Sequence, residues 1–213
     1  MKGLFITFEG PDGSGKTTQM RLLSERLASM GADVVRTREP GGTRIGDRLR
    51  EIVLSPENEE MQDETEILLY AASRAQHVRE VIEPALERGR IVICDRFVDA
   101  SIAYQGYGLG RDPDEVARIN RFATGGLRPH RTYLLDVPVE VSRERLLARA
   151  QASGGEGLDR IERKEREYHE RVREGFLLIA KAEPQRVTRI DASRSVDEIA
   201  ADIHADFDRL VQR

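Results

Sequence analysis

Short apolar segments alternate along the chain with longer segments in which apolar residues recur every three or four positions. The short segments are rich in branched side chains and continuously apolar, which is typical of parallel β-strands covered on both faces. This pattern predicts strands over residues 4–8, 33–37, 90–94, 132–135 and 187–190.

The longer segments have the spacing of amphipathic helices. Residues 20–30 carry an apolar stripe that Gly31 ends, and residues 196–210 carry a second one. Asp63 and Glu66 have the spacing of a capping box and predict another helix start. Strand and helix alternate along the whole chain, which predicts an α/β fold with a five-stranded, doubly wound parallel sheet and right-handed crossovers.

Composition narrows the class of protein. Of 213 residues, 39% are hydrophobic, so we expect one domain over residues 1–213. The charged residues make up 34% but balance to a net charge of −4, which argues against a nucleic-acid polymer as a partner. No run approaches the roughly 18 apolar residues of a membrane span, and the start is too short for a signal peptide. The lone Cys94 excludes an internal disulfide framework, so we expect a cytoplasmic protein without membrane association.

The stretch GPDGSGKTT follows the first predicted strand and matches the phosphate-binding loop pattern from Gly10 to Thr17. Glycines let successive N–H groups point inward, and the next helix directs its positive dipole end at the same place. Lys16, expected at the exposed end of the loop, can reach the β- and γ-phosphates, and Thr17 can ligate Mg²⁺. The alternative is an ordinary glycine-rich turn. We predict that a nucleoside triphosphate binds Gly10, Pro11, Asp12, Gly13, Ser14, Gly15, Lys16, Thr17 and Thr18.

The third predicted strand ends in Asp95 and Arg96, within IVICDRF. A carboxylate at this place is suited to the metal beside a phosphate loop, so Asp95 is a predicted metal ligand. Arg96 faces the crevice in which α/β sheets bind ligands and favours a second anion, although a buried ion pair would also explain it.

Two further stretches indicate a second site. The segment TREPGGTRIGDRLR places a fixed turn before a cluster of arginines. In LLYAASRAQ, Tyr70 and Arg74 share a helix face and can stack on a base and donate to its edge. The alternative for that pair is a core tyrosine with a surface arginine. Residues 150–160 are small and polar and precede a run dense in charge, which is either a solvated helix face or part of a moving lid.

The motifs FEGPDGSGKTT, TREPGGT, AASRAQH, CDRFVDASIAYQGYG and LDRIE together resemble those of bacterial thymidylate kinases over essentially the whole chain. The resemblance implies the nucleoside monophosphate kinase fold of the P-loop NTPases, with a short lid. It also implies transfer of the γ-phosphoryl group of ATP to dTMP, a requirement for Mg²⁺, and a homodimer formed by helix packing.

The resemblance also implies roles for individual residues. Asp12 faces the sugar 3′-hydroxyl and the phosphate of dTMP, and Arg50 and Arg96 hold its 5′-phosphate. Tyr70 stacks on thymine and Arg74 donates to O4. The remaining substrate residues are Ser101 and Gln105 along the base edge, Tyr104 where a ribose 2′-hydroxyl would lie, and Glu39 and Pro40 in a turn that is often cis.

One position departs from some relatives, which carry an arginine inside the phosphate loop where this chain has Gly13. We expect Arg149, or as second choice Arg160, to supply the transition-state charge from the lid. Two other functions remain open: a kinase for another nucleoside or nucleotide, and a nucleotide-dependent switch. The base-edge set argues against the first, and the absence of an Asn-Lys-x-Asp motif argues against a GTPase switch.

Overall fold

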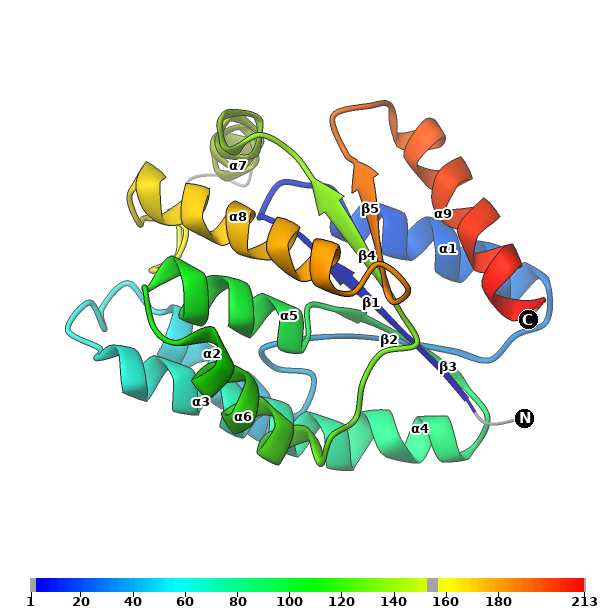
Figure 1. The fold of residues 1–213 in the computed structure, drawn as a ribbon, viewed down its shortest axis with the longest axis horizontal. Helices are drawn as coiled ribbons and strands as arrows, with labels where there is room; N and C mark the ends of the chain where they lie inside the picture. The colour runs from blue at the N-terminus through cyan, green and yellow to red at the C-terminus, as the bar shows by residue number, and fades with distance from the viewer. Residues whose placement is uncertain (1–2, 153–156, 213) are drawn as a thin grey trace.

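The computed structural model describes residues 3–152 and 157–212, and Figure 1 shows a central sheet with helices on both sides. All strands pair in parallel in the order β2-β3-β1-β4-β5, so the predicted five-stranded parallel sheet is confirmed. The strands are β1 (Leu4–Glu9), β2 (Val34–Arg38), β3 (Ile91–Asp95), β4 (Arg131–Asp136) and β5 (Val187–Asp191).

Helices form the connections between the strands. π-Helical turns at Val78–Ile82 and Ile102–Gly108 join α3 to α4 and extend α5. The helices are α1 (Lys16–Ser29), α2 (Arg44–Leu54), α3 (Asp63–His77), α4 (Glu83–Glu87), α5 (Val98–Ser101), α6 (Pro113–Thr124), α7 (Val139–Ala152), α8 (Arg166–Ala182) and α9 (Val196–Val211).

The apolar side chains of the sheet are buried on both faces. Ile6 packs with Leu23 of α1 and Phe207 of α9 on one face of the sheet. The preceding residue, Phe5, packs with Ile82 on the other face. Strand side chains alternate between faces, so this double coverage explains why the strands read as continuously apolar. The charge-dense run after the predicted lid enters α8 at Arg166, and this helix also buries Tyr168, Val172 and Phe176.

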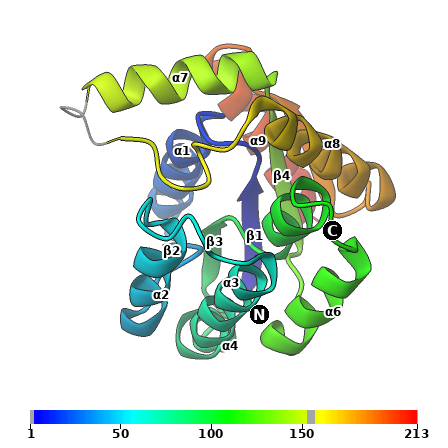
Figure 2. The ribbon, with the colours of Figure 1, turned by 90° about the vertical axis from the view of Figure 1, so that its left-hand side faces the viewer.

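The sheet order determines where a ligand can bind. After β1 the chain adds β2 and β3 on one side of it and then crosses to β4 on the other. Ligands bind at such a switch point, outside the carboxyl ends of the strands. The predicted phosphate loop follows β1 at this edge, and α7 lies across the end toward which β1 points (Figure 2).

The predicted capping box at the start of α3 is wrong. Gln62 precedes the helix and gives no side-chain cap, and Asp63 is already the first helical residue. The Glu66 carboxylate does not turn back to the helix start. Instead it is buried and accepts hydrogen bonds from Gln105 and Arg160, as described below.

Candidate functional site

The segment from Gly10 to Thr18 forms the expected turn between β1 and α1. Gly15 has a left-handed backbone (φ 94°) immediately before the helix, which begins at Lys16. Lys16 is buried, not exposed as expected, because its ammonium folds back and donates to the carbonyls of Gly10 (3.1 Å) and Pro11 (2.9 Å). Burial and the nearby Arg96 cation lower the pKa of Lys16.

A cavity opens over this turn, and we call it the loop cavity. It brings together the phosphate loop, the end of β3 and the last turns of α7. Its lining residues are Asp12, Gly13, Gly15, Lys16, Thr17, Thr18, Arg38, Glu39, Arg50, Asp95, Arg96 and Arg149.

The two predicted metal ligands both line the loop cavity. Asp95 Oδ1 is buried and has no hydrogen-bond partner within the described residues, and the Thr17 side chain is exposed to the same space. Carboxylate and hydroxyl oxygens are hard ligands of the kind that Mg²⁺ takes, usually together with phosphate oxygens and water. The residues present therefore fit a magnesium ion beside the loop.

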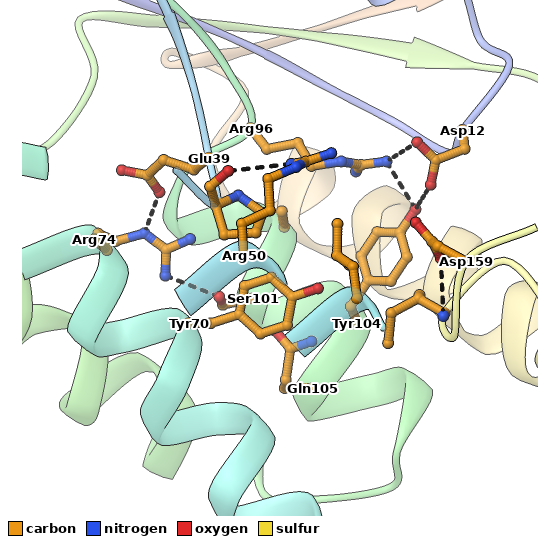
Figure 3. Close-up of a pocket in the computed structure, with 14 residues that line it drawn as sticks. Asp12, Glu39, Arg50, Tyr70, Arg74, Arg96, Ser101, Tyr104, Gln105 and Asp159 are labelled. Atoms are coloured by element: carbon orange, nitrogen blue, oxygen red, sulfur yellow. Dashed lines mark hydrogen bonds and ion pairs between the residues drawn. The ribbon is translucent and has the colours of Figure 1, made fainter. Parts of the chain in front are cut away.

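A second cavity lies next to the first, and we call it the deep pocket (Figure 3). Every residue that the resemblance assigns to substrate binding lines it, and the Glu39–Pro40 peptide bond is cis as expected. The lining residues are Asp12, Glu39, Pro40, Arg50, Leu54, Tyr70, Arg74, Arg96, Ala100, Ser101, Tyr104, Gln105, Asp159 and Ile161.

The two cavities share a wall that contains Asp12, Glu39, Arg50 and Arg96. Arg96 donates to the Gly10 carbonyl (2.9 Å), to Asp12 Oδ1 (2.8 Å) and to the Tyr104 hydroxyl (3.1 Å). Its guanidinium also lies 4.8 Å from the centre of the Tyr104 ring. These contacts hold Arg96 in a left-handed backbone (φ 66°), a conformation that a residue with a Cβ rarely adopts.

The shared wall holds a carboxylate and several cations close together. Burial raises the pKa of Asp12, but the Arg96 and Lys16 cations outweigh burial and hold that pKa well below its ordinary value. Asp12 is therefore a carboxylate at neutral pH. Arg50, whose Nη1 donates to the Pro40 carbonyl (3.1 Å), adds a further cation where the two cavities meet.

Arg74 is fixed in the wall of the deep pocket. Its Nε donates to Glu39 Oε2 (2.6 Å), Nη1 to Ser101 Oγ (2.8 Å) and to Asn120 Oδ1, and Nη2 to the Phe97 carbonyl (2.9 Å). The side chain is almost fully buried, so it is not a surface arginine.

Tyr70 lies one turn before Arg74 on α3. It is only partly buried and lines the deep pocket, so the core-tyrosine alternative is not supported. A ring and a guanidinium thus face one pocket from the same helix.

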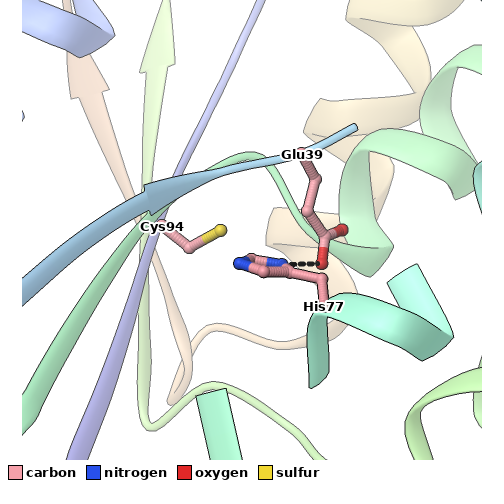
Figure 4. A group of neighbouring side chains, drawn as sticks. All are labelled: Glu39, His77 and Cys94. Carbon is pink, nitrogen blue, oxygen red and sulfur yellow. Dashed lines mark hydrogen bonds and ion pairs between the residues drawn. The ribbon is translucent and has the colours of Figure 1, made fainter. Parts of the chain in front are cut away.

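Glu39 is itself positioned by a buried cluster of Glu39, His77 and Cys94, whose ligand-type atoms lie within 4.8 Å of one another (Figure 4). His77 contacts Glu39 Oε1 (2.9 Å) through Nδ1 and Thr37 Oγ1 (2.6 Å) through Nε2. Burial and the Glu39 charge raise the pKa of Cys94, and its thiol donates to the Arg96 carbonyl (3.1 Å). The cluster is therefore a hydrogen-bonded support for Glu39 and, through it, for Arg74.

The structure separates the two predicted lid arginines. Arg149 lines the loop cavity and forms an ion pair with Glu162 (2.6 Å). Arg160 does not line that cavity. It is buried, with Nε donating to the Val53 carbonyl (2.9 Å) and Nη2 to Glu66 (2.6 Å), which corrects its assignment as a transition-state residue. Part of the predicted lid, residues 153–156, lies outside the described residues.

The packing of α7 explains why the loop has Gly13 and no arginine. Gly13 has a positive φ (77°), and a Cβ there would lie 2.8 Å from the Ser142 carbonyl. Ser142 Oγ donates to the Asp12 carbonyl (2.6 Å) and Arg145 Nη1 to the Gly13 carbonyl (3.3 Å), so this face of α7 is docked on the loop. Arg149 follows one turn later on the same face, over the loop cavity.

Several site residues were not anticipated from the sequence. Asp159 lines the deep pocket, and burial together with the Glu162 and Asp12 charges raises its pKa to about 6. Glu66 accepts a hydrogen bond from Gln105. The sequence does contain a signal for it, because Glu66 lies four residues before Tyr70 and therefore on the same helix face. Asn120 comes from α6, far along the chain, and no local pattern indicates it.

Comparisons with known proteins agree with this geometry. The family model described as thymidylate kinase matches residues 8–203. A thymidylate kinase of Exiguobacterium sibiricum is 52% identical over 97% of this chain and 94% of its own. One of Symbiobacterium thermophilum is also 52% identical, over 99% and 95%. The crystal structure of a thymidylate kinase from Ehrlichia chaffeensis aligns with a TM-score of 0.78 at 33% identity, covering 98% of this chain and 99% of that one.

Proposed function

Because this chain belongs to the thymidylate kinase family, we propose that it transfers the γ-phosphoryl group of ATP directly to dTMP, giving dTDP for dTTP synthesis. One observation carries the proposal. The loop cavity and the deep pocket meet at a wall of Asp12, Arg50 and Arg96, so a triphosphate and a monophosphate bound in them would place their phosphates side by side.

On the donor side, the loop amides and Lys16 would hold the β- and γ-phosphates of ATP. Lys16 is poised for this, since its ammonium now donates to two carbonyls of its own loop, which a phosphate could replace. Thr17 and Asp95 would hold Mg²⁺, which supplies neutralisation of phosphate charge when bound.

On the acceptor side, Arg50 and Arg96 would bind the 5′-phosphate of dTMP, with Asp12 beside the sugar 3′-hydroxyl. Tyr70 would stack on thymine while Arg74 donates to O4. Ser101 and Gln105 would line the base edge, Tyr104 would crowd a ribose 2′-hydroxyl, and the Glu39–Pro40 turn would close the pocket.

No covalent intermediate is required. In-line attack by a phosphate oxygen of dTMP depends mainly on positioning and on neutralising the transferring group. Arg149 would supply charge at that group from α7, exchanging its bond to Glu162 for the phosphoryl oxygens.

A panel of nucleoside monophosphates tests the proposal. With ATP and Mg²⁺ present, ADP should form rapidly with dTMP and slowly with ribonucleotides and purine nucleotides. Slow ATP hydrolysis that is indifferent to the panel would support a nucleotide-dependent switch instead. Preference for another nucleotide would support a related kinase.

We also propose a cytoplasmic homodimer. Large apolar side chains are exposed on three neighbouring helices: Ile45 and Ile52 on α2, Leu68 on α3, and Phe122, which is 90% exposed, on α6. Such side chains are typical of helix-packed interfaces. Sedimentation should give a dimer that Phe122→Glu weakens. Among the described residues no helix is long and apolar enough to cross a membrane.

A further inference from the structure

Glu66 lies behind the deep pocket without lining it. It precedes Tyr70 by four residues and Arg74 by eight on α3, so the three side chains point the same way from one helix. Only 1% of Glu66 is exposed, which makes it one of the most buried carboxylates in the described part of the chain.

Both oxygens of Glu66 are bonded. Oε1 accepts from Gln105 Nε2 (2.9 Å), and Oε2 accepts from Arg160 Nη2 (2.6 Å). A carboxylate paired with an arginine is ionised and can only accept hydrogen bonds. The Gln105 amide must therefore turn its nitrogen toward Glu66.

This constraint determines what Gln105 offers to a ligand. With its nitrogen directed at Glu66, the amide carbonyl is left to face elsewhere, and Gln105 lines the deep pocket. Within the described residues no group donates a hydrogen bond to Gln105 Oε1. The atom is nevertheless absent from the set of fully buried polar atoms without a partner, so part of its surface is accessible. Oε1 is therefore open to the pocket as an acceptor.

We propose that Glu66 is a positioning residue that sets the base preference of the deep pocket, by fixing the Gln105 carbonyl as an acceptor for a pyrimidine N3–H. The inference rests on the proposed function. Thymine and uracil carry a proton on N3, whereas neutral cytosine has an unprotonated acceptor there that would face the Gln105 carbonyl. Part of the preference for thymine over cytosine thus originates outside the residues that touch the base.

Arg160 makes the effect of Glu66→Gln predictable. The buried guanidinium requires an acceptor, so the new amide at position 66 would give its oxygen to Arg160 and its nitrogen to Gln105. Gln105 would then accept through Oε1 and turn its own NH₂ toward the pocket. The variant should therefore present a donor where the wild type presents an acceptor.

The test compares kcat/KM for dTMP, dUMP and dCMP in the wild type and in Glu66→Gln. The dTMP/dCMP ratio should fall by about 100-fold, within the range that one hydrogen-bonded contact to a base edge contributes to discrimination. The preference should not invert, because Arg74 still donates at the next position of the base edge. The dTMP/dUMP ratio should stay unchanged, because both bases present the same atoms to Gln105. Glu64→Gln, which removes an exposed charge from the same turn, is the matched control and should change neither ratio.

A double variant distinguishes a positioning role of Glu66 from general damage to the structure. Glu66→Gln combined with Gln105→Glu restores an acceptor on the pocket side at unchanged net charge, and should recover the dTMP/dCMP ratio. If Glu66→Gln folds poorly, Glu66→Met with Arg160→Met removes the buried pair together and should also lower that ratio. The ratio of kcat/KM for two nucleotides, measured on one protein sample, does not depend on the fraction of that sample that is active.

The outcomes distinguish the two claims. An unchanged dTMP/dCMP ratio in Glu66→Gln, or an equal collapse of both ratios, overturns the role of Glu66 while leaving a thymidylate kinase. A wild type that shows no preference for dTMP overturns the proposed function itself.

Discussion

Replacing Arg96 with alanine should weaken dTMP binding far more than ATP binding. The guanidinium lies in the wall between the cavities, 14% exposed, and is held by the Gly10 carbonyl, Asp12 and Tyr104. Without it, the Asp12 carboxylate keeps the Lys16 ammonium, at 4.0 Å, as an ion-pair partner and faces the incoming phosphate. The variant therefore loses an attraction and gains a repulsion.

The expected size follows from the desolvated charge pair. Removing one partner of such a pair costs about 2–5 kcal/mol, which is about 30- to 5,000-fold in the dissociation constant of dTMP. ATP should be affected much less, because the loop amides and Lys16 are untouched. Isothermal titration of each nucleotide alone measures both constants, with dTMP and a non-hydrolysable ATP analogue.

Two variants complete this experiment. Arg21→Ala removes an exposed arginine paired with Glu25 on α1 and should change neither constant. Asp12→Asn added to Arg96→Ala removes the carboxylate that has lost Arg96 as its partner and should recover part of the dTMP affinity. Equal loss of affinity for both nucleotides in Arg96→Ala would refute the assignment of Arg96 to the acceptor phosphate.

Three other substitutions test separate residues, two of the site and one buried in β1. Arg149→Ala should lower kcat by about 10³- to 10⁵-fold at nearly unchanged KM values; near-normal kcat would place the transition-state charge elsewhere. Tyr70→Ala should raise the KM for dTMP by about 5- to 150-fold, the equivalent of a base-stacking contact, with less effect on ATP; early melting with unchanged KM would instead indicate a packing role. Burial and Asp99 raise the pKa of Glu9 to about 8. Since the unfolded chain releases this proton near pH 4.5 and the folded chain retains it to about pH 8, Glu9 should lower stability progressively across that window. Glu9→Gln should therefore gain stability over the wild type between pH 5 and pH 8 in denaturant titrations, and a constant difference would contradict the shift.

The sequence predicted most of the fold because the relevant signals are local. The five strands read as apolar segments, and the glycine pattern of residues 10–18 is sufficient to place a phosphate loop after β1. Carboxyl ends of parallel strands meet at one edge, so the sequence alone indicates that Asp95 and Arg96 lie beside that loop.

The errors arose where a side chain has a choice of partner. Glu66 has capping-box spacing but pairs with Arg160, almost a hundred positions away in the chain, because burial makes an unpaired carboxylate costly. Arg160 was expected near the phosphates but pairs with Glu66 instead. Charge alone does not indicate which distant partner an arginine will have. Lys16 was expected to be exposed, but its own loop carbonyls are near enough to bury it.

A single-turnover reaction tests the central claim most directly. Enzyme in excess is mixed with ATP labelled at the γ-phosphate, Mg²⁺ and dTMP, quenched over time, and analysed for label in nucleotide, inorganic phosphate and protein. Direct transfer predicts that label appears in dTDP at the rate at which it leaves ATP, with none on the protein. Label that accumulates on the protein or as inorganic phosphate, with no labelled dTDP, would contradict this assignment.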